Sequence, residues 1–283
     1  MIPKIKKKLK SILLKTVWSF GPEDLIRVIR KMGVHKGDVV MVHSSWKTDS
    51  GFRGTPQQLV QAFIDTVGQT GTLCMMSMPF HNMTAAEYLK KGKVFDVRKT
   101  VSMVGLPSEI FRRRKDAVRS LHPTHSVAAC GPKAEWLIEG HEKCLSPFGS
   151  KSPFDKMVQA NAKLLMYDVP FNTMTFEHYL EDRFQESLPR PLYNESLQEG
   201  KCRDQFKTEV IVKTKVIANE LNMLRSDRLE STLGEWNCLR TGSVARTSLK
   251  VLSCRSAVQY IAALDGHMKP FYISPTSLSG IVP

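Results

Sequence analysis

One histidine and two glutamates stand close together in the segment Phe-Asn-Thr-Met-Thr-Phe-Glu-His-Tyr-Leu-Glu-Asp-Arg, residues 171–183. If the segment is a helix, His178 and Glu181 are three residues apart and share a face, whereas Glu177 points elsewhere. Thr175 is a good N-cap for the first turn. An imidazole beside a carboxylate is the usual equipment of a general base, and a helix start offers free backbone N–H groups. The alternative is a surface helix with an inert histidine, which is the more frequent case for a lone histidine.

The composition limits the partners that this chemistry could serve. The chain has 283 residues and a net charge of +14, from 41 basic and 27 acidic side chains. Such a surface favours anionic partners, namely nucleic acid, membrane headgroups or phosphorylated small molecules. No segment has the apolar length that spans a bilayer. The six cysteines are scattered without Cys-x-x-Cys or zinc spacing, which indicates reduced thiols in a cytoplasmic protein and no metal site.

Apolar runs alternate with helical patterns along the chain, which predicts an α/β fold: a layered, mixed and largely parallel sheet with flanking helices. The first buried strand, at 38–43, would deliver His43, Ser44 and Ser45 to the sheet edge where open α/β folds bind ligands. Further strands are expected at 72–78, 126–130, 162–169 and 206–216, and helices at 21–33, 55–67, 106–114 and 152–160, with one more strand and a closing helix within 249–264.

The chain is expected to form a single domain over residues 21–283, preceded by a basic N-terminal helix at 1–20. Ile5, Leu9 and Ile12 would lie on one face of this helix with lysines around them. Packing against its own domain is favoured over weak contact of residues 1–18 with an anionic membrane.

Six motifs recur in a fixed order: Val-His-Ser-Ser (42–45), Gly-Thr-Leu followed by Met-Pro-Phe (71–80), Phe-Asp (95–96), His-Pro-Thr-His-Ser-Val-Ala-Ala-x-Gly-Pro-x-Ala (122–134), Pro-Phe-Gly-x-x-Ser-Pro-Phe (147–154), and Lys-Leu-Leu-Met with Asn-Thr-x-Thr-x-x-His-x-x-Glu (163–181). In this order and at this spacing the motifs resemble the aminoglycoside 3-N-acetyltransferase family, closely from Asp38 to Arg183 and loosely beyond. The resemblance implies that family's fold, acetyl-CoA as co-substrate, and acetyl transfer to an amino group of an aminoglycoside or amino sugar.

The resemblance also implies roles for particular residues. His178 matches the family's catalytic histidine, Glu181 the carboxylate three residues on, and Glu209 is the best match for an acid that orients the imidazole. Glu87 or Asp96 would receive the amines of the acceptor. The coenzyme site would be formed by His43, Ser44, Ser45, Thr100, Val101, Met103, Gly105 and Ser126.

The chemistry required is consistent with these residues. An amine must lose a proton to attack a thioester, and a histidine with a pKa near 6.5 held by a carboxylate can remove it. The +14 balance suits the phosphates of coenzyme A without invoking nucleic acid. A homodimer is left open.

The acceptor is less well specified, because the chain departs from the antibiotic-modifying members of the family. Those members have an acidic substrate cleft, whereas acids are few between Met75 and Lys93. A basic rim would repel an aminoglycoside and attract a nucleotide-linked or polysaccharide amino sugar, which is therefore an alternative acceptor. A non-catalytic basic binding module is a second, less favoured alternative. The rim would consist of Arg225, Arg228, Arg240, Arg246, Lys250 and Arg255.

Overall fold

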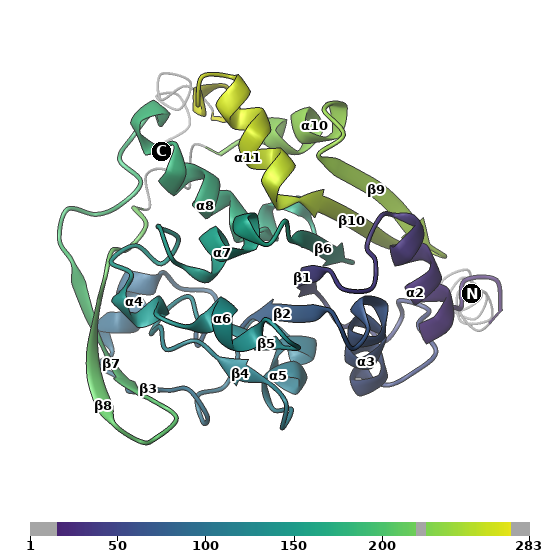
Figure 1. Ribbon diagram of the computed structural model, residues 1–283, viewed down its shortest axis with the longest axis horizontal. Helices are drawn as coiled ribbons and strands as arrows, with labels where there is room; N and C mark the ends of the chain where they lie inside the picture. The colour runs from purple at the N-terminus through teal and green to yellow at the C-terminus, as the bar shows by residue number, and fades with distance from the viewer. Residues whose placement is uncertain (1–15, 219–224, 273–283) are drawn as a thin grey trace, which may run out of the picture.

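The computed structural model describes residues 16–218 and 225–272, so the expected N-terminal helix lies mostly outside the described part of the chain. Its main feature is a seven-stranded sheet in the order β4-β5-β2-β1-β6-β10-β9 (Figure 1). The strands are β1 (Val39–Ser44), β2 (Thr72–Met76), β4 (Val118–Arg119), β5 (Val127–Cys130), β6 (Lys163–Tyr167), β9 (Leu239–Val244) and β10 (Thr247–Ser253).

Parallel pairing occupies the centre of this sheet. β1 pairs in parallel with β2 on one side and with β6 on the other, whereas β4, β5, β9 and β10 add antiparallel pairs at the two edges. The predicted α/β fold with a mixed sheet is therefore confirmed. Because the three parallel strands point the same way, their carboxyl ends open onto one edge of the sheet, where such folds bind ligands.

Helices cover both faces of the sheet and make three layers (Figure 1). On β1, Val40 and Val42 belong to the core under one set of helices, whereas Val39 and Met41 belong to the core under the other set. Successive side chains of a strand point to opposite faces, so a strand that is apolar throughout is the expected result. One layer contains α2 (Pro22–Lys31), α3 (Pro56–Val67) and α5 (Leu106–Arg112); the other contains α6 (Ala134–Ile138), α7 (Pro153–Gln159), α8 (Phe176–Arg183), α10 (Arg228–Glu235) and α11 (Cys254–Ala263).

The structure also contains a second sheet, which has three strands and is separate from the seven-stranded one. It runs in the order β3-β7-β8, with β3 (Phe95–Asp96), β7 (Gln198–Arg203) and β8 (Glu209–Thr214), next to helix α4 (Ala85–Lys90). Only β8 was expected from the sequence. All six cysteines are buried and free. No helix in the described ranges combines the length and apolarity needed to cross a membrane.

The segment at 171–183 forms a short 3-10 turn, Phe171–Thr173, and then helix α8. Thr175 occupies the N-cap position but has helical backbone angles, and its side chain makes no capping hydrogen bond. The predicted capping role of Thr175 is therefore wrong. The helix itself is as expected, and it starts at the sheet edge because β6 ends just before it.

Gly131, which follows β5, packs closely against the residues at the start of β2. Gly131 has φ +117°, and a Cβ there would lie 2.3 Å from the Gly71 carbonyl oxygen; Gly140 has φ +76° and open space within 4 Å. Positive φ costs roughly 1–3 kcal/mol for other residues, and overpacking adds about 1–3 kcal/mol. We expect Gly131→Ala to lower the free energy of unfolding more than Gly140→Ala, as measured by urea denaturation. Equal losses would mean that the contact with Gly71 relaxes without cost.

Candidate active site

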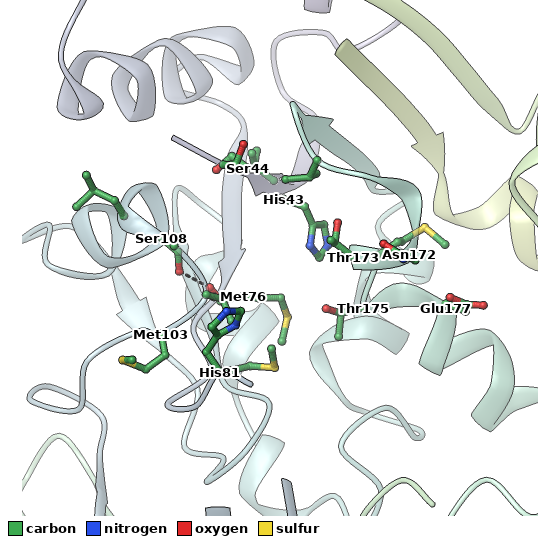
Figure 2. Close-up of a pocket in the computed structure, with 18 of the residues that line it drawn as sticks. His43, Ser44, Met76, His81, Met103, Ser108, Asn172, Thr173, Thr175 and Glu177 are labelled. Atoms are coloured by element: carbon green, nitrogen blue, oxygen red, sulfur yellow. Dashed lines mark hydrogen bonds between the residues drawn. The ribbon is translucent and has the colours of Figure 1, made fainter. Parts of the chain in front are cut away.

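A cavity of about 640 Å³ opens at the carboxyl ends of the parallel strands (Figure 2). Its wall combines segments that are distant in the sequence. His43 and Ser44 come from the end of β1, and Met76 comes from the end of β2. The segment after β6 contributes residues 172–175, and α8 adds Glu177 and His178. The strand order therefore places the helix with the histidine against the strand with the Ser-Ser pair.

His178 lines this cavity, and Glu181 contacts its imidazole on the side away from the cavity. The Nδ1 of His178 lies 2.8 Å from Oε2 of Glu181, which is completely buried. The His178 side chain keeps 19% of its surface exposed. Nδ1 also lies 2.7 Å from Nη2 of Arg225, so the tautomer of the ring decides which of the two contacts is a hydrogen bond. In the tautomer with the proton on Nδ1, Nδ1–H donates to the carboxylate, and the other ring nitrogen, Nε2, keeps a lone pair that no described residue occupies with a hydrogen bond. This is the arrangement of an oriented base.

Arg225 completes the cluster from a part of the chain where only a basic rim was expected. Its Nε donates to Oε1 of Glu181 at 2.8 Å, and its Nη2 donates to Oε2, so the guanidinium grips the carboxylate with two parallel bonds. The Tyr272 hydroxyl donates a further hydrogen bond to Oε1. Glu181 thus has donors from three directions. Burial opposes its ionised form, but His178 and Arg225 outweigh burial and lower its pKa to about 2.

The charge of His178 follows from the same contacts. Burial lowers its pKa below the ordinary value of 6.5, and Arg225 lowers it further because its Nη2 lies 2.7 Å from Nδ1. The hydrogen bond to Glu181 acts in the opposite direction and does not overcome the first two effects. His178 is therefore neutral at pH 7 and able to accept a proton.

Glu177 is a second carboxylate of α8 that lies at this site. It lines the cavity with only 8% of its surface exposed, and it forms an ion pair with Arg225, whose Nε lies 3.8 Å from Oε1. Burial raises its pKa to about 7, against the opposing effect of Arg225. The site therefore holds two carboxylates with different properties, because its surroundings lower the pKa of Glu181 and raise that of Glu177.

His43 and Phe148 define the surroundings of the histidine. Phe148 is fully buried, and its ring centroid lies 5.0 Å from that of His178. His43 is buried at the cavity wall, and its Nε2 has no hydrogen-bond partner among the described residues. Burial lowers the pKa of His43 to about 4, so this ring is neutral as well.

Comparison with known proteins gives these residues a context. The family model described as aminoglycoside 3-N-acetyltransferase matches residues 41–264. The chain belongs to this family. Among curated relatives, the aminoglycoside N(3)-acetyltransferase III of Salmonella sp. is 32% identical over 169 residues, which cover 56% of this chain and 58% of that protein. The match therefore spans little more than half the length of this relative.

Solved structures of similar fold include two acetyltransferases. The aminoglycoside acetyltransferase AAC(3)-Xa has a TM-score of 0.76 at 22% identity, over 94% of this chain and 99% of that one. AAC-IIIb, in a binary structure with CoASH, has a TM-score of 0.69 at 19% identity, over 90% of this chain and 98% of that one. At these identities the likeness shows the fold.

The residues that the acetyltransferase resemblance assigned to the coenzyme divide into two groups. His43, Ser44, Ser45, Met103 and Gly105 all line the cavity. Ser45 also anchors the strand end, since its hydroxyl donates to the Asp168 carbonyl at 2.8 Å.

Three coenzyme candidates are not part of the cavity wall. Val101 is exposed and precedes Met103. Thr100 uses its hydroxyl to accept the backbone N–H of Asp96 at 2.8 Å. Ser126 is completely buried, where it donates to the Ser77 carbonyl at 2.6 Å and accepts from Arg119. Thr100, Val101 and Ser126 thus lie outside the described cavity wall, and the hydroxyls of Thr100 and Ser126 make hydrogen bonds inside the protein.

The acidic candidates outside α8 also have other roles. Glu209 is exposed on β8 and pairs with Arg203, so it does not orient His178. Glu87 accepts from the Thr84 backbone in the capping box of α4. Asp96 accepts the backbone N–H groups of the following turn, from Arg98 and Lys99. Neither Glu87 nor Asp96 lines the cavity.

The expected basic rim is likewise absent from the described part of the cavity wall. Of the six basic residues proposed for it, only Arg225 lines the cavity, and Glu181 neutralises it. Lys250 pairs with Glu230, Arg246 lies over the Trp18 ring, and Arg255 donates to carbonyls of the α7 end. The excess of basic residues in the sequence is therefore not concentrated in the described cavity wall.

A pair of matched variants tests which glutamate supports the histidine. Glu181→Gln removes the charge that holds Nδ1–H and leaves Arg225 beside the imidazole, so we expect kcat/KM for acetyl transfer to fall at least about tenfold. Glu209→Gln should leave kcat/KM within twofold of the wild-type value. The opposite order would return the orienting role to Glu209.

Proposed function

We propose that the chain is an acetyl-CoA-dependent N-acetyltransferase in which His178 is the general base. The observation that carries this proposal is the fixed imidazole: Glu181 engages Nδ1 at 2.8 Å, while the ring stands in the wall of a cavity at the sheet edge. The family membership supports the same reaction class. Because relatives are matched over little more than half of their length, the activity is proposed from this site and not from their names.

The reaction forms a C–N bond and breaks a C–S bond. The amine nitrogen attacks the thioester carbonyl while Nε2 of His178 takes a proton from it, and the thiolate leaves. The proton on His178 then neutralises the thiolate or passes to solvent. A positioned base of this kind contributes about 10²–10⁴-fold, and a neutral imidazole at pH 7 is the form that can act. Transfer is direct, with no acyl-enzyme.

Coenzyme A would lie along the ends of β1 and the start of α5. His43, Ser44 and Ser45 form one side of that path, and Met103 and Gly105 form the other. The free Nε2 of His43 and the Ser44 hydroxyl are the polar atoms suited to the pantetheine amides. AAC-IIIb, whose fold is similar, has a structure with CoASH, which supports coenzyme A as the co-substrate of this chain.

The two carboxylates of α8, Glu177 and Glu181, have different roles in this proposal. Glu181, with its pKa at about 2, stays ionised and holds the imidazole. Glu177, at the cavity wall, is the carboxylate that an acceptor amine can reach. An anionic amino sugar, the alternative acceptor, would need a cation in the cavity wall. The described wall has only Arg225 for this purpose, and Arg225 is already paired with Glu181.

His178→Ala gives the direct test of the proposed base. We expect kcat/KM to fall by about 10²–10⁴-fold in a thiol-release assay. Coenzyme A should still raise the melting temperature of the variant, because ligand that binds the native state stabilises it. His35→Ala is a matched control, since the side chain of His35 is 70% exposed and lies outside the cavity. A folded His178→Ala protein with the wild-type rate would contradict the proposed role.

A further inference from the structure

Strand β8 forms one edge of the three-stranded sheet, and β7 is the one described strand that pairs with it (Figure 1). The backbone groups of successive residues in a strand point to opposite sides. The Thr208 carbonyl accepts the Asp204 N–H at 3.0 Å, so Thr208 faces β7. Glu209, Ile211 and Lys213 therefore direct their N–H and C=O groups away from β7, where no described residue hydrogen-bonds to them. Such an edge is a template for a further strand.

The unpaired part of this edge is short. Lys215, which the alternation places on the same outer side, donates its N–H to the Leu145 carbonyl at 2.7 Å, so the edge is covered there. At the other end the chain turns at Lys207, which has φ +69°. The open edge is therefore the stretch 209–213, with Ile211 at its centre and 55% exposed. It fits a short strand.

The sequence of β8 is complementary to itself about Ile211. Two residues before Ile211 stands Glu209, and two residues after it stands Lys213. If a second copy of β8 lies antiparallel with Ile211 against Ile211, each Glu209 is directly opposite the partner's Lys213. The outward N–H and C=O groups of all three positions then find partners. Opposite charges in directly opposed positions stabilise antiparallel strands, whereas like charges destabilise them.

Strand β7 extends this pattern of charges on the same exposed face. It places Arg203 beside Glu209 and forms an ion pair there. It also places Glu199 beside Lys213, again as an ion pair. Across two joined hairpins the charges would alternate in sign at every strand. The row would contain Arg203, Glu209, the partner's Lys213 and the partner's Glu199. This alternation favours a second copy of the chain over an unrelated strand.

The opposite face of the sheet also favours pairing. Val212 is buried with Phe95 and Cys202 in a small hydrophobic core, whereas Val210 is only partly buried at its margin. In the antiparallel register Val210 would lie opposite the partner's Val212. Pairing would therefore bury apolar surface that a single copy leaves at the edge of the sheet.

We propose that two copies of this chain associate through β8, antiparallel about a twofold axis at Ile211. The contact joins the two three-stranded sheets into one of six strands. It is isologous, because the same patch of each copy meets itself. Since the open edge is short, the association is weak and depends on concentration. The proposal is independent of acetyl transfer, because β7 and β8 contribute none of the described residues that line the cavity.

Light scattering of the full chain tests the association. We expect the mean mass to rise from that of one chain toward that of two between about 1 and 100 µM. Ile211→Lys should keep the mass of one chain, because two like charges would meet at the axis. It should leave the melting temperature unchanged, since Ile211 is 55% exposed. Val17→Lys is a matched control at a residue that is 74% exposed and precedes α2, and it should associate like the wild type.

Charge reversal tests the register. Glu209→Lys and Lys213→Glu each oppose like charges twice across the axis, so each variant alone should associate at least about tenfold more weakly than the wild type. An equimolar mixture of the two variants should associate again, because every opposed pair is then a lysine with a glutamate. The mixture contains the same two folded chains, so a loss of stability in either variant cannot produce the recovery.

The contrary results are equally defined. A wild-type chain with the mass of one copy up to about 100 µM would overturn the proposal. Dimers that Ile211→Lys leaves intact would place the interface away from β8 and would overturn it too. Variants that dissociate alone and do not associate when mixed would overturn the antiparallel register.

Discussion

The candidate site depends on one buried carboxylate. Glu181 is completely buried, and such a group is tolerated only when donors surround it. His178 from its own helix, Arg225 from the segment before α10 and Tyr272 from the end of the described chain all contact it. Removing one of these donors would leave a charge without compensation. The same contacts that stabilise Glu181 therefore fix the orientation of His178 and tie the C-terminal part of the chain to α8.

Arg225 has a double effect in this cluster. It stabilises the ionised form of Glu181 and, being 2.7 Å from Nδ1, disfavours a second positive charge on His178. A carboxylate alone would raise the pKa of a neighbouring histidine and keep it protonated at pH 7. With Arg225 and burial the ring is oriented by a carboxylate and still neutral. For a base that must accept a proton from an amine, this is the useful combination.

The sequence allowed the fold and the centre of the site to be predicted, because both depend on local patterns. Apolar runs located β1, β2 and β6, and the three-residue spacing paired His178 with Glu181. Arg225 could not be found in this way, since it lies 44 residues from Glu181 and belongs to no periodic pattern shared with it. Helical spacing alone separates Glu177 from His178, because adjacent residues diverge on a helix, yet both line the cavity. The role of Glu87 can be read from the sequence, because Thr84 precedes it by three residues, which is the spacing of a capping box.

The charge of the cavity wall differs from the net charge of the whole chain. The net charge of +14 suggested a basic site, yet the described cavity wall is close to neutral and mainly apolar. Surface charge affects the approach of an anionic coenzyme over long distances, whereas the acceptor meets only the groups within the wall. The composition of the whole chain therefore does not predict the charge of the groups that line the cavity.

The central claim is that His178 is a neutral, oriented base, and its titration tests this most directly. In protein labelled with ¹⁵N-histidine, with the signal assigned by comparison with His178→Ala, ring shifts are followed against pH. A lowered pKa means that the neutral form persists as pH falls, so we predict a midpoint below 6.5, the ordinary histidine value, and an upward shift of the midpoint in Arg225→Gln. A midpoint at or above 6.5 in the wild-type protein, or no shift in the variant, would contradict the account.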